Sequence, residues 1–162
     1  MRQSLSEHRS IDIHPPEPVT RNWRAAARAV KLAVALSAVL AVAAIIDQAG
    51  GRSLAEHATA IYTPYGKQAD PNLLYGLVYA VAAIGALLWL LVLLVVQSGG
   101  RSAPILTVVV TTLTAALGLL LLGTTEYGAR VFPPLWGILA MLPAAAGVVA
   151  AVLLRRHRTH HS

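Results

Sequence analysis

Four long apolar runs constrain what this chain can fold into. They cover residues 25–46, 73–96, 103–123 and 131–154, and short polar breaks separate them. A hydrocarbon core about 30 Å thick is crossed by about 20 residues of helix, so each run is long enough to span it. The runs are continuous rather than alternating, and they exceed the length of a barrel strand, about 10 residues. The sequence therefore predicts an all-α fold, a four-helix transmembrane bundle.

The composition leads to the same class of protein. Hydrophobic residues make up 56% of the 162 residues and charged residues only 12%, against about 25% charged residues in an ordinary globular domain. A small soluble domain leaves much of its surface in water, and this chain has too few charged groups to cover that surface. A bilayer accommodates the apolar outer faces, so we expect an integral membrane protein.

The basic residues predict the orientation of the bundle. With the N-terminus in the cytoplasm, ten basic residues lie inside and three, Arg52, Lys67 and Arg130, lie outside. This excess follows the positive-inside rule and predicts a multi-pass protein of the cell membrane with both termini cytoplasmic. Anionic lipids of the inner leaflet are then expected partners. Nucleic acid is not expected, because no aromatic or motif context accompanies the charge.

The polar segments divide the chain into one membrane domain and two tails. Residues 1–22 are rich in proline and poor in large apolar side chains, which predicts a disordered cytoplasmic tail. Residues 23–155 form the transmembrane domain, and residues 156–162 form a basic cytoplasmic tail. The tail histidines, at positions 157, 160 and 161, are a weak metal-binding signal.

The longest connection, residues 47–72, is predicted to carry a short extracytoplasmic helix. A glycine pair at positions 50–51 is expected to end the first membrane helix. Ser53 and Glu56 then have the spacing of a capping box, in which each side chain bonds to the other's backbone N–H. We expect this short helix to run to about Tyr62.

The membrane interior lacks the groups that most reactions need. Apart from Arg28 and Lys31 at the inner edge of the first run, no Asp, Glu, Lys, Arg or His lies within the four runs, which argues against proton relays and ion-coupled transport. The chain has no cysteine, so disulfides and thiol chemistry are excluded. No spaced metal-ligand motif and no nucleophile–base set is recognisable. We therefore expect a protein that is not an enzyme and that needs neither a cofactor nor a metal.

Three threonines of the third run are candidate ligand-facing residues. Thr107, Thr111 and Thr114 recur at intervals of four and three residues, which places them on one face of a helix. They would line a polar groove between helices, or they would bond to their own helix carbonyls or to a neighbouring helix. The sequence leaves both interpretations open.

The predicted outer surface gathers the remaining candidate ligand-facing residues, which are polar or aromatic: Asp47, His57, Tyr62, Tyr65 and Glu126. A cluster of carboxylates with a histidine would bind a ligand at the outer face. The alternative is that these are solvated loop residues, with Glu126 paired to Arg130 four positions on and the tyrosines anchored among lipid headgroups.

The order of motifs from Asp47 onward resembles that of uncharacterised small four-helix integral membrane proteins of high-GC actinobacteria. The motifs that carry the resemblance are Asp47-Gln48, Glu56-His57-Ala58, Tyr62-Thr63-Pro64-Tyr65-Gly66, Leu74-Tyr75, Trp89, Glu126-Tyr127-Gly128 and Pro133-Pro134-Leu135-Trp136-Gly137. The resemblance implies the four-helix membrane fold and brings no activity with it.

Two function classes remain open. The first is a non-enzymatic, partner-binding or structural membrane subunit, which packs against a homo-oligomer partner or another membrane protein through small-residue seams such as Ala29, Ala33, Ser37 and Ala41. The second is a small-molecule or lipid binding or permeation unit, which uses a cleft under the 47–72 loop and the threonine face of the third helix. The empty interior favours the first class.

The predicted orientation can be tested with single cysteines, since the chain has none of its own. We expect Lys67→Cys to react with a membrane-impermeant maleimide on intact cells and Gly100→Cys to react only after permeabilisation. Labelling in the reverse pattern would overturn the orientation.

Overall fold

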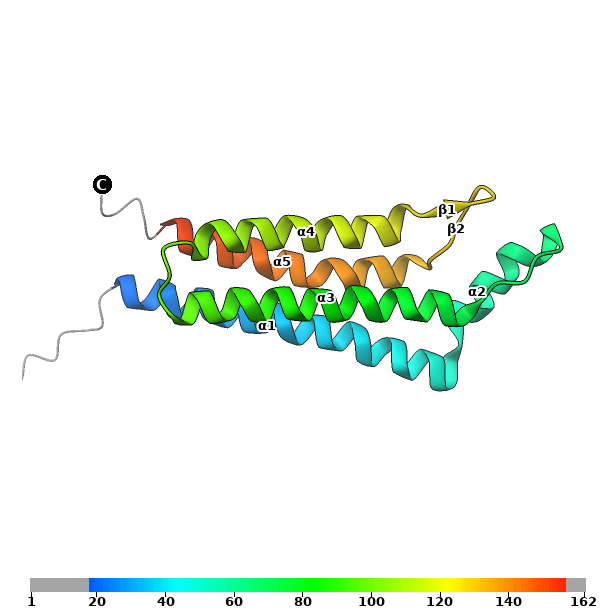
Figure 1. Ribbon diagram of the computed structural model, residues 1–162, viewed down its shortest axis with the longest axis horizontal. Helices are drawn as coiled ribbons and strands as arrows, with labels where there is room; N and C mark the ends of the chain where they lie inside the picture. Colours follow the sequence, from blue (N-terminus) through cyan, green and yellow to red (C-terminus); the bar gives the residue numbers. More distant parts are fainter. Residues whose placement is uncertain (1–17, 157–162) are drawn as a thin grey trace, which may run out of the picture.

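A computed structural model describes residues 18–156 of the chain, with side chains from residue 23 onward. The elements, in chain order, are α1 (Pro18–Ile46), a π-helical turn (Asp47–Gly51), α2 (Ser53–Tyr62), a 3₁₀ turn (Thr63–Tyr65), α3 (Pro71–Gln97), α4 (Ala103–Gly123), β1 (Thr125–Glu126), β2 (Ala129–Arg130) and α5 (Pro134–Arg156) (Figure 1).

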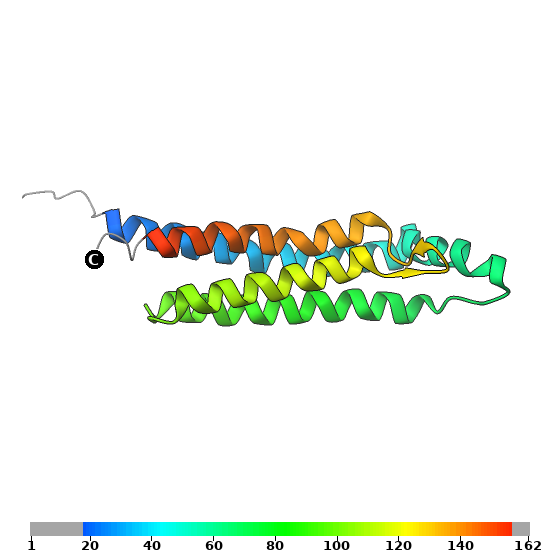
Figure 2. The same ribbon diagram turned by 90° about the horizontal axis from the view of Figure 1, so that it is seen from above.

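The predicted bundle is confirmed. Four helices are long and apolar enough to cross a membrane: α1 with its π-helical turn, α3, α4 and α5. They run side by side along one long axis (Figures 1 and 2). The short helix expected between the first two spans is α2, and it ends at Tyr62 as predicted. The protein is a multi-pass membrane protein.

The helix bounds differ from the prediction at two places. α1 begins at Pro18, so the assignment of residues 18–22 to the disordered tail was wrong, while residues 1–17 lie outside the described part of the chain. Proline fits the first turn of a helix, and the Arg- and Ala-rich sequence that follows continues the helix readily. α5 begins at Pro134 rather than near Val131, because proline disfavours helical backbone in the residue before it.

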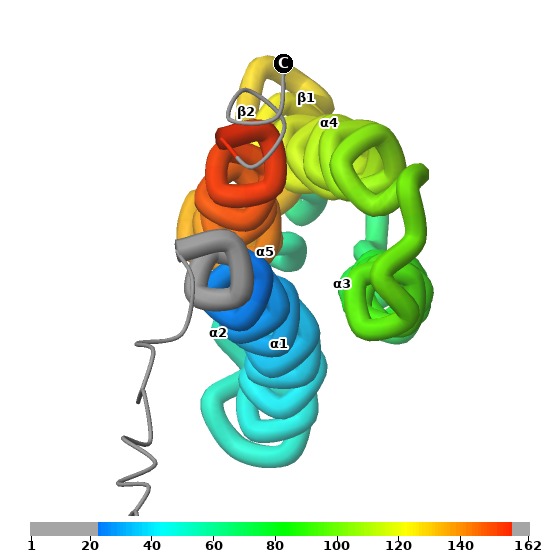
Figure 3. Tube along the Cα trace, turned by 90° about the vertical axis from the view of Figure 1, so that its left-hand side faces the viewer, coloured from blue at the N-terminus to red at the C-terminus, as the bar shows by residue number. Residues whose placement is uncertain are grey.

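The helices pack in a chain of neighbours rather than a closed square. α1 packs extensively against α3 and α5, and α5 packs against α4, whereas α3 and α4 make fewer contacts with each other (Figure 3). A short link, residues 98–102, joins α3 and α4 and makes them antiparallel. Gly99 has a φ of +69° in this link, a conformation that glycine adopts without steric cost.

Close approaches at small residues hold the neighbours together. Gly85 of α3 lies against Ser37 of α1, where a Cβ would be 3.3 Å from Oγ of Ser37. Such approaches let helices pack by van der Waals contact where no hydrophobic force acts between them. Part of the small-residue seam of α1, at Ser37, therefore packs against another helix of this same chain.

The largest fully buried side chain in the half of the bundle near the termini is Trp89 of α3. It reaches across to α5, where it lies against Gly147. A Cβ at position 147 would overlap the edge of the Trp89 ring and would lie 2.5 Å from Oγ1 of Thr111 of α4. Because Gly147 has no side chain, the Trp89 indole of α3 and the Thr111 hydroxyl of α4 both fit against α5 at this point.

Adding a methyl group at this point should loosen the bundle. We expect Gly147→Ala to lower the free energy of unfolding by about 1–3 kcal/mol, the usual cost of overpacking, in thermal unfolding measured in detergent micelles. Gly76→Ala is the matched control, because a Cβ at position 76 would have no atom within 4 Å. Trp89→Leu in the Gly147→Ala background should recover part of the loss. Equal effects of the two alanine substitutions would contradict this packing.

Candidate functional site

Most of the described polar residues outside the membrane spans gather in a cap at one end of the bundle. We define the cap as residues 47–72 together with the β1–β2 hairpin, residues 124–131. It lies at the opposite end of the bundle from both ends of the described chain, and α2 and the hairpin extend beyond the membrane helices (Figure 1). The cap is the place where a ligand site could be built from polar side chains.

Asp47 holds the cap to the membrane helices. One carboxylate oxygen accepts hydrogen bonds from the backbone N–H (3.0 Å) and the hydroxyl (2.6 Å) of Ser53. The other accepts from the N–H of Leu54 (3.1 Å) and from the hydroxyl of Tyr75 (2.6 Å). Asp47 therefore caps the N-terminus of α2 from the end of α1 and ties both to α3.

The capping box predicted from Ser53 and Glu56 was wrong. Ser53 is the first residue of α2, and the residue before it, Arg52, makes no side-chain capping bond. Asp47 supplies the acceptor instead, because the chain turns sharply at Arg52, whose φ is 50°. The position of Gly51 is part of this geometry, since a Cβ there would lie 3.1 Å from Oδ1 of Asp47.

The glycine pair ends the first membrane helix, as predicted. The sequence did not predict the form of that end, which is a π-helical turn that continues α1 to Gly51. The backbone N–H of Arg52 then donates to the carbonyl of Asp47 at 2.6 Å. The wider turn brings the Asp47 carboxylate back toward the first N–H groups of α2.

A two-stranded hairpin, which the sequence did not predict, fastens α2 from the other side. Thr125 pairs with Arg130 across the strands, and the turn residues Tyr127 and Gly128 have φ values of 53° and 78°, as a type I′ turn requires. Nε2 of His57, on α2, lies 2.9 Å from the carbonyl oxygen of Arg130 and donates to it. The hairpin therefore docks on α2 through its backbone.

An aromatic cluster completes this contact. The rings of Tyr65 and Tyr127 are stacked at 4.2 Å between centroids, and Tyr62 meets Tyr127 edge to face at 5.9 Å. The Tyr62 hydroxyl donates to the carboxylate of Glu126, and the ammonium of Lys67 donates to the Tyr127 hydroxyl. We call these five residues the tyrosine latch, because they join the loop after α2 to the hairpin.

The eight candidate ligand-facing residues all make hydrogen bonds within the protein. Thr107, Thr111 and Thr114 each donate to the backbone carbonyl four residues earlier in α4, at 2.7 Å, so their hydroxyls serve their own helix. The other five bond within the cap or to α3: Asp47, His57, Tyr62, Tyr65 and Glu126. The structure brings four of these five onto the α2–hairpin contact, and Glu126 bonds to Tyr62 there rather than to Arg130.

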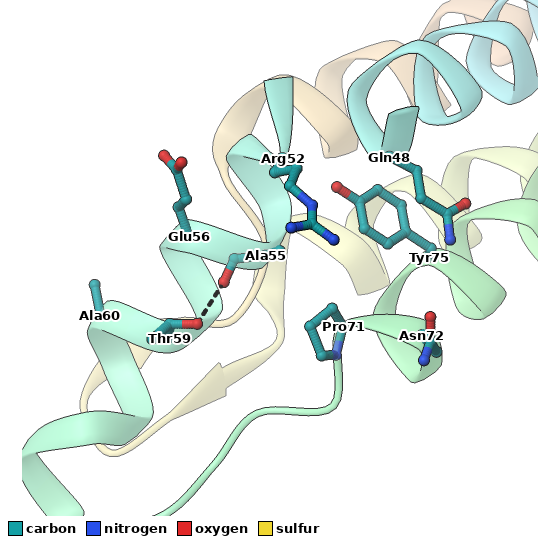
Figure 4. A pocket seen from close by; sticks show the side chains of 9 residues that line it. All are labelled: Gln48, Arg52, Ala55, Glu56, Thr59, Ala60, Pro71, Asn72 and Tyr75. Carbon is teal, nitrogen blue, oxygen red and sulfur yellow. Dashed lines mark hydrogen bonds between the residues drawn. The ribbon is translucent and has the colours of Figure 1, made fainter. Parts of the chain in front are cut away.

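A pocket of about 610 Å³ lies beside Asp47, between α2 and the adjoining ends of α1 and α3. Its lining residues are labelled in Figure 4: Gln48, Arg52, Ala55, Glu56, Thr59, Ala60, Pro71, Asn72 and Tyr75. Three of these side chains, those of Arg52, Gln48 and Asn72, carry hydrogen-bond donors that have no partner among residues 18–156. The sequence analysis did not predict these three as ligand-facing residues. The signal for Arg52 was present, since it is one of only three basic residues predicted outside.

Arg52 determines the charge of this pocket. Its guanidinium turns into the pocket, whereas the carboxylate of Glu56 turns away from it (Figure 4). Gln48 accepts a hydrogen bond from Tyr79 through Oε1 at 2.6 Å, which leaves its amide N–H groups to donate. The pocket therefore offers a cation and amide donors to a ligand, and it suits an anionic group.

The histidines and acids that the structure describes do not form a metal site. Within residues 18–156, no three His, Asp or Glu side chains are placed to hold one ion. The tail histidines at positions 157, 160 and 161 lie outside the described residues.

Alkaline pH should release the tyrosine latch. The hydrogen bond to Glu126 raises the pKa of Tyr62 above its ordinary 10.0, and the hydrogen bond to Tyr127 raises the pKa of Lys67 above its ordinary 10.5. A pKa raised by folding gives stability that is complete below the ordinary value and is lost as the pH rises through the folded value. We therefore expect an intact latch at neutral pH, which weakens as the pH rises beyond about 10 and is released once the pH exceeds the raised pKa of Tyr62.

Tyrosinate absorbance, followed against pH, checks this expectation. Glu126→Gln should move one tyrosine titration down toward pH 10, and Tyr62→Phe should remove that component. Tyr65→Phe is the control and should leave the Tyr62 component in place. Identical curves for the wild type and Glu126→Gln would contradict the bond.

Comparisons with protein families, with curated proteins and with solved structures find no match to this chain.

Proposed function

We propose that the protein is a non-enzymatic membrane protein that binds a small anionic ligand in the cap pocket. The single observation that carries the proposal is the Arg52 guanidinium, which turns into a pocket of about 610 Å³ and has no carboxylate partner among residues 18–156. With the N-terminus in the cytoplasm, as the distribution of basic residues favours, the pocket lies at the outer face of the cell membrane.

The chemistry of the lining supports an anion. The guanidinium presents paired N–H donors that match a phosphate or carboxylate, and Gln48 and Asn72 add neutral donors. Hydrogen bonds to a charged group contribute about 1.5–3 kcal/mol each. Two of them correspond to a dissociation constant near 1 mM, or about 4 kcal/mol. The expected binding is therefore weak for a bare anion and tighter for a ligand with further contacts.

Two features favour ligand binding over the partner-binding class. Ala33 and Ser37, from the seam on which that class depended, are buried within this bundle. The cap is also fixed before any ligand arrives, because the Asp47 bonds and the tyrosine latch hold α2 from two sides. A preformed site loses less conformational entropy when it binds. Binding of a partner membrane protein stays a prediction.

The non-enzymatic part of the proposal is supported by how the reactive groups are used. His57 is turned to a backbone carbonyl of the hairpin, and Asp47 accepts four hydrogen bonds. Neither group is left free to act as a base on a molecule in the pocket. A base needs a proton of the substrate within hydrogen-bond reach.

Thermal unfolding in detergent, with glycerol 3-phosphate as the probe, tests the site. At twenty times the dissociation constant we expect the wild type to gain about 2 kcal/mol of stability, while Arg52→Gln gains almost nothing. Arg130→Gln is the matched control, because Arg130 is the other arginine of the cap and does not line the pocket. Equal gains in the wild type and in Arg52→Gln, or no gain in either, would overturn the proposal.

A further inference from the structure

We propose that the anionic group bound by Arg52 is the phosphate of an anionic glycerophospholipid, taken from the leaflet that borders the cap. The headgroup occupies the pocket, and an acyl chain runs down the seam between α1 and α3. This inference rests on the proposed function and names its ligand class.

The depth of the pocket places it among lipid headgroups. Its floor and sides come from the ends of two membrane-spanning segments: Gln48 lies near the end of the span 23–51, and Pro71 and Asn72 begin the span 71–97. The ends of membrane helices lie where the hydrocarbon meets the headgroups. The Arg52 guanidinium is therefore level with the phosphates of the adjacent leaflet.

The polar lining fits a phosphate diester with a hydroxylated headgroup. The planar guanidinium matches two phosphate oxygens at once, and in Figure 4 it faces the part of the pocket bordered by Pro71 and Tyr75. Gln48 and Asn72 stand on opposite helices beside it and can donate to headgroup hydroxyls. Phosphatidylglycerol has this combination of one negative charge and free hydroxyls.

An apolar path for the acyl chain begins directly beneath the pocket. Ile45 of α1 precedes Gln48 by three residues, which places it on the same side of the helix, and 56% of its surface is exposed. On α3 the half-buried ring of Tyr79 follows Tyr75 by four residues, and Ala83 follows Tyr79 by four more. An acyl chain along Ile45 and this side of α3 is held by van der Waals contact, because no hydrophobic force acts within the hydrocarbon.

A soluble phosphate compound has the same phosphate chemistry as the lipid headgroup but has no acyl chain. The test therefore compares dioleoyl phosphatidylglycerol in dodecyl maltoside micelles with glycerol 3-phosphate, by the thermal stabilisation of the full-length protein. We expect the lipid to bind at least tenfold more tightly than glycerol 3-phosphate. Arg52→Gln should weaken both by tenfold or more, Arg52→Lys should weaken both to a smaller degree, and Arg130→Gln should change neither.

A second pair of variants isolates the chain contacts. Ile45→Ser should weaken the lipid at least threefold and leave glycerol 3-phosphate unchanged. Ile84→Ser is the control, because Ile84 is also exposed and lies nine residues after Tyr75, about two and a half turns, on the opposite side of α3. The basic residues at the other end of the bundle are also expected to attract anionic lipid, but none of these five variants alters them.

Each outcome decides one of the two proposals. Arg52-dependent binding of both probes at equal affinity overturns the lipid assignment and keeps the anion site. Lipid binding that is the same in Arg52→Gln and Arg130→Gln also overturns the lipid assignment. If neither probe binds in an Arg52-dependent way, the proposed function itself fails. Tighter lipid binding that depends on both Arg52 and Ile45 supports both proposals.

Discussion

The four hydrogen bonds accepted by the Asp47 carboxylate determine the shape of the cap. They join the end of α1, the first turn of α2 and the hydroxyl of Tyr75 on α3. An isolated helix of ten residues is marginal in water, so α2 depends on this cap and on its buried residues, Leu54 and Ala58. The pocket lies on the side of α2 that Asp47 holds toward α1 and α3, and without those bonds its walls would not be fixed.

The bundle beneath the cap is held by fit rather than by polar bonds. The indole N–H groups of Trp89 and Trp136 are both buried without a hydrogen-bond partner within the described chain, although such groups usually have one. What these rings provide is bulk: Trp89 fills the space beside Gly147, and Trp136 belongs to the core under the cap together with Phe132 and Tyr75. Close packing at glycines takes the place of polar contacts between helices.

Polar side chains have different roles in the membrane spans and in the cap, because the two regions have different surroundings. In the spans, threonines such as Thr107 and Thr114 bond to their own helix and stay buried, so no polar path enters the bundle through them. In the cap, water and headgroups compete for polar groups, and contacts between segments distant in the chain have to be assembled from several side chains. The tyrosine latch is such an assembly, since it joins residues 62–67 to the hairpin turn. Arg52 is left over from these assemblies and faces the pocket.

The sequence by itself determined the four membrane helices, their approximate bounds and the short helix between the first two. It did so because the length and continuity of an apolar run are local properties that a bilayer selects directly. It also singled out Asp47, His57, Tyr62, Tyr65 and Glu126 as residues of interest. It could not say what they touch, because each partner lies 6–73 residues away along the chain.

Only the tertiary structure decided how the cap is built and which residue faces a ligand. Asp47 caps α2 in place of the predicted Ser53, because a π-helical turn and the left-handed backbone of Arg52 bring the Asp47 carboxylate back to α2. The same turn directs the Arg52 guanidinium into the pocket (Figure 4). A side chain's direction depends on the backbone conformation that tertiary contacts stabilise, and neither residue type nor spacing encodes it. The sequence therefore determined that the chain is a membrane protein, and the tertiary structure decided that the Arg52 guanidinium points into the cap pocket.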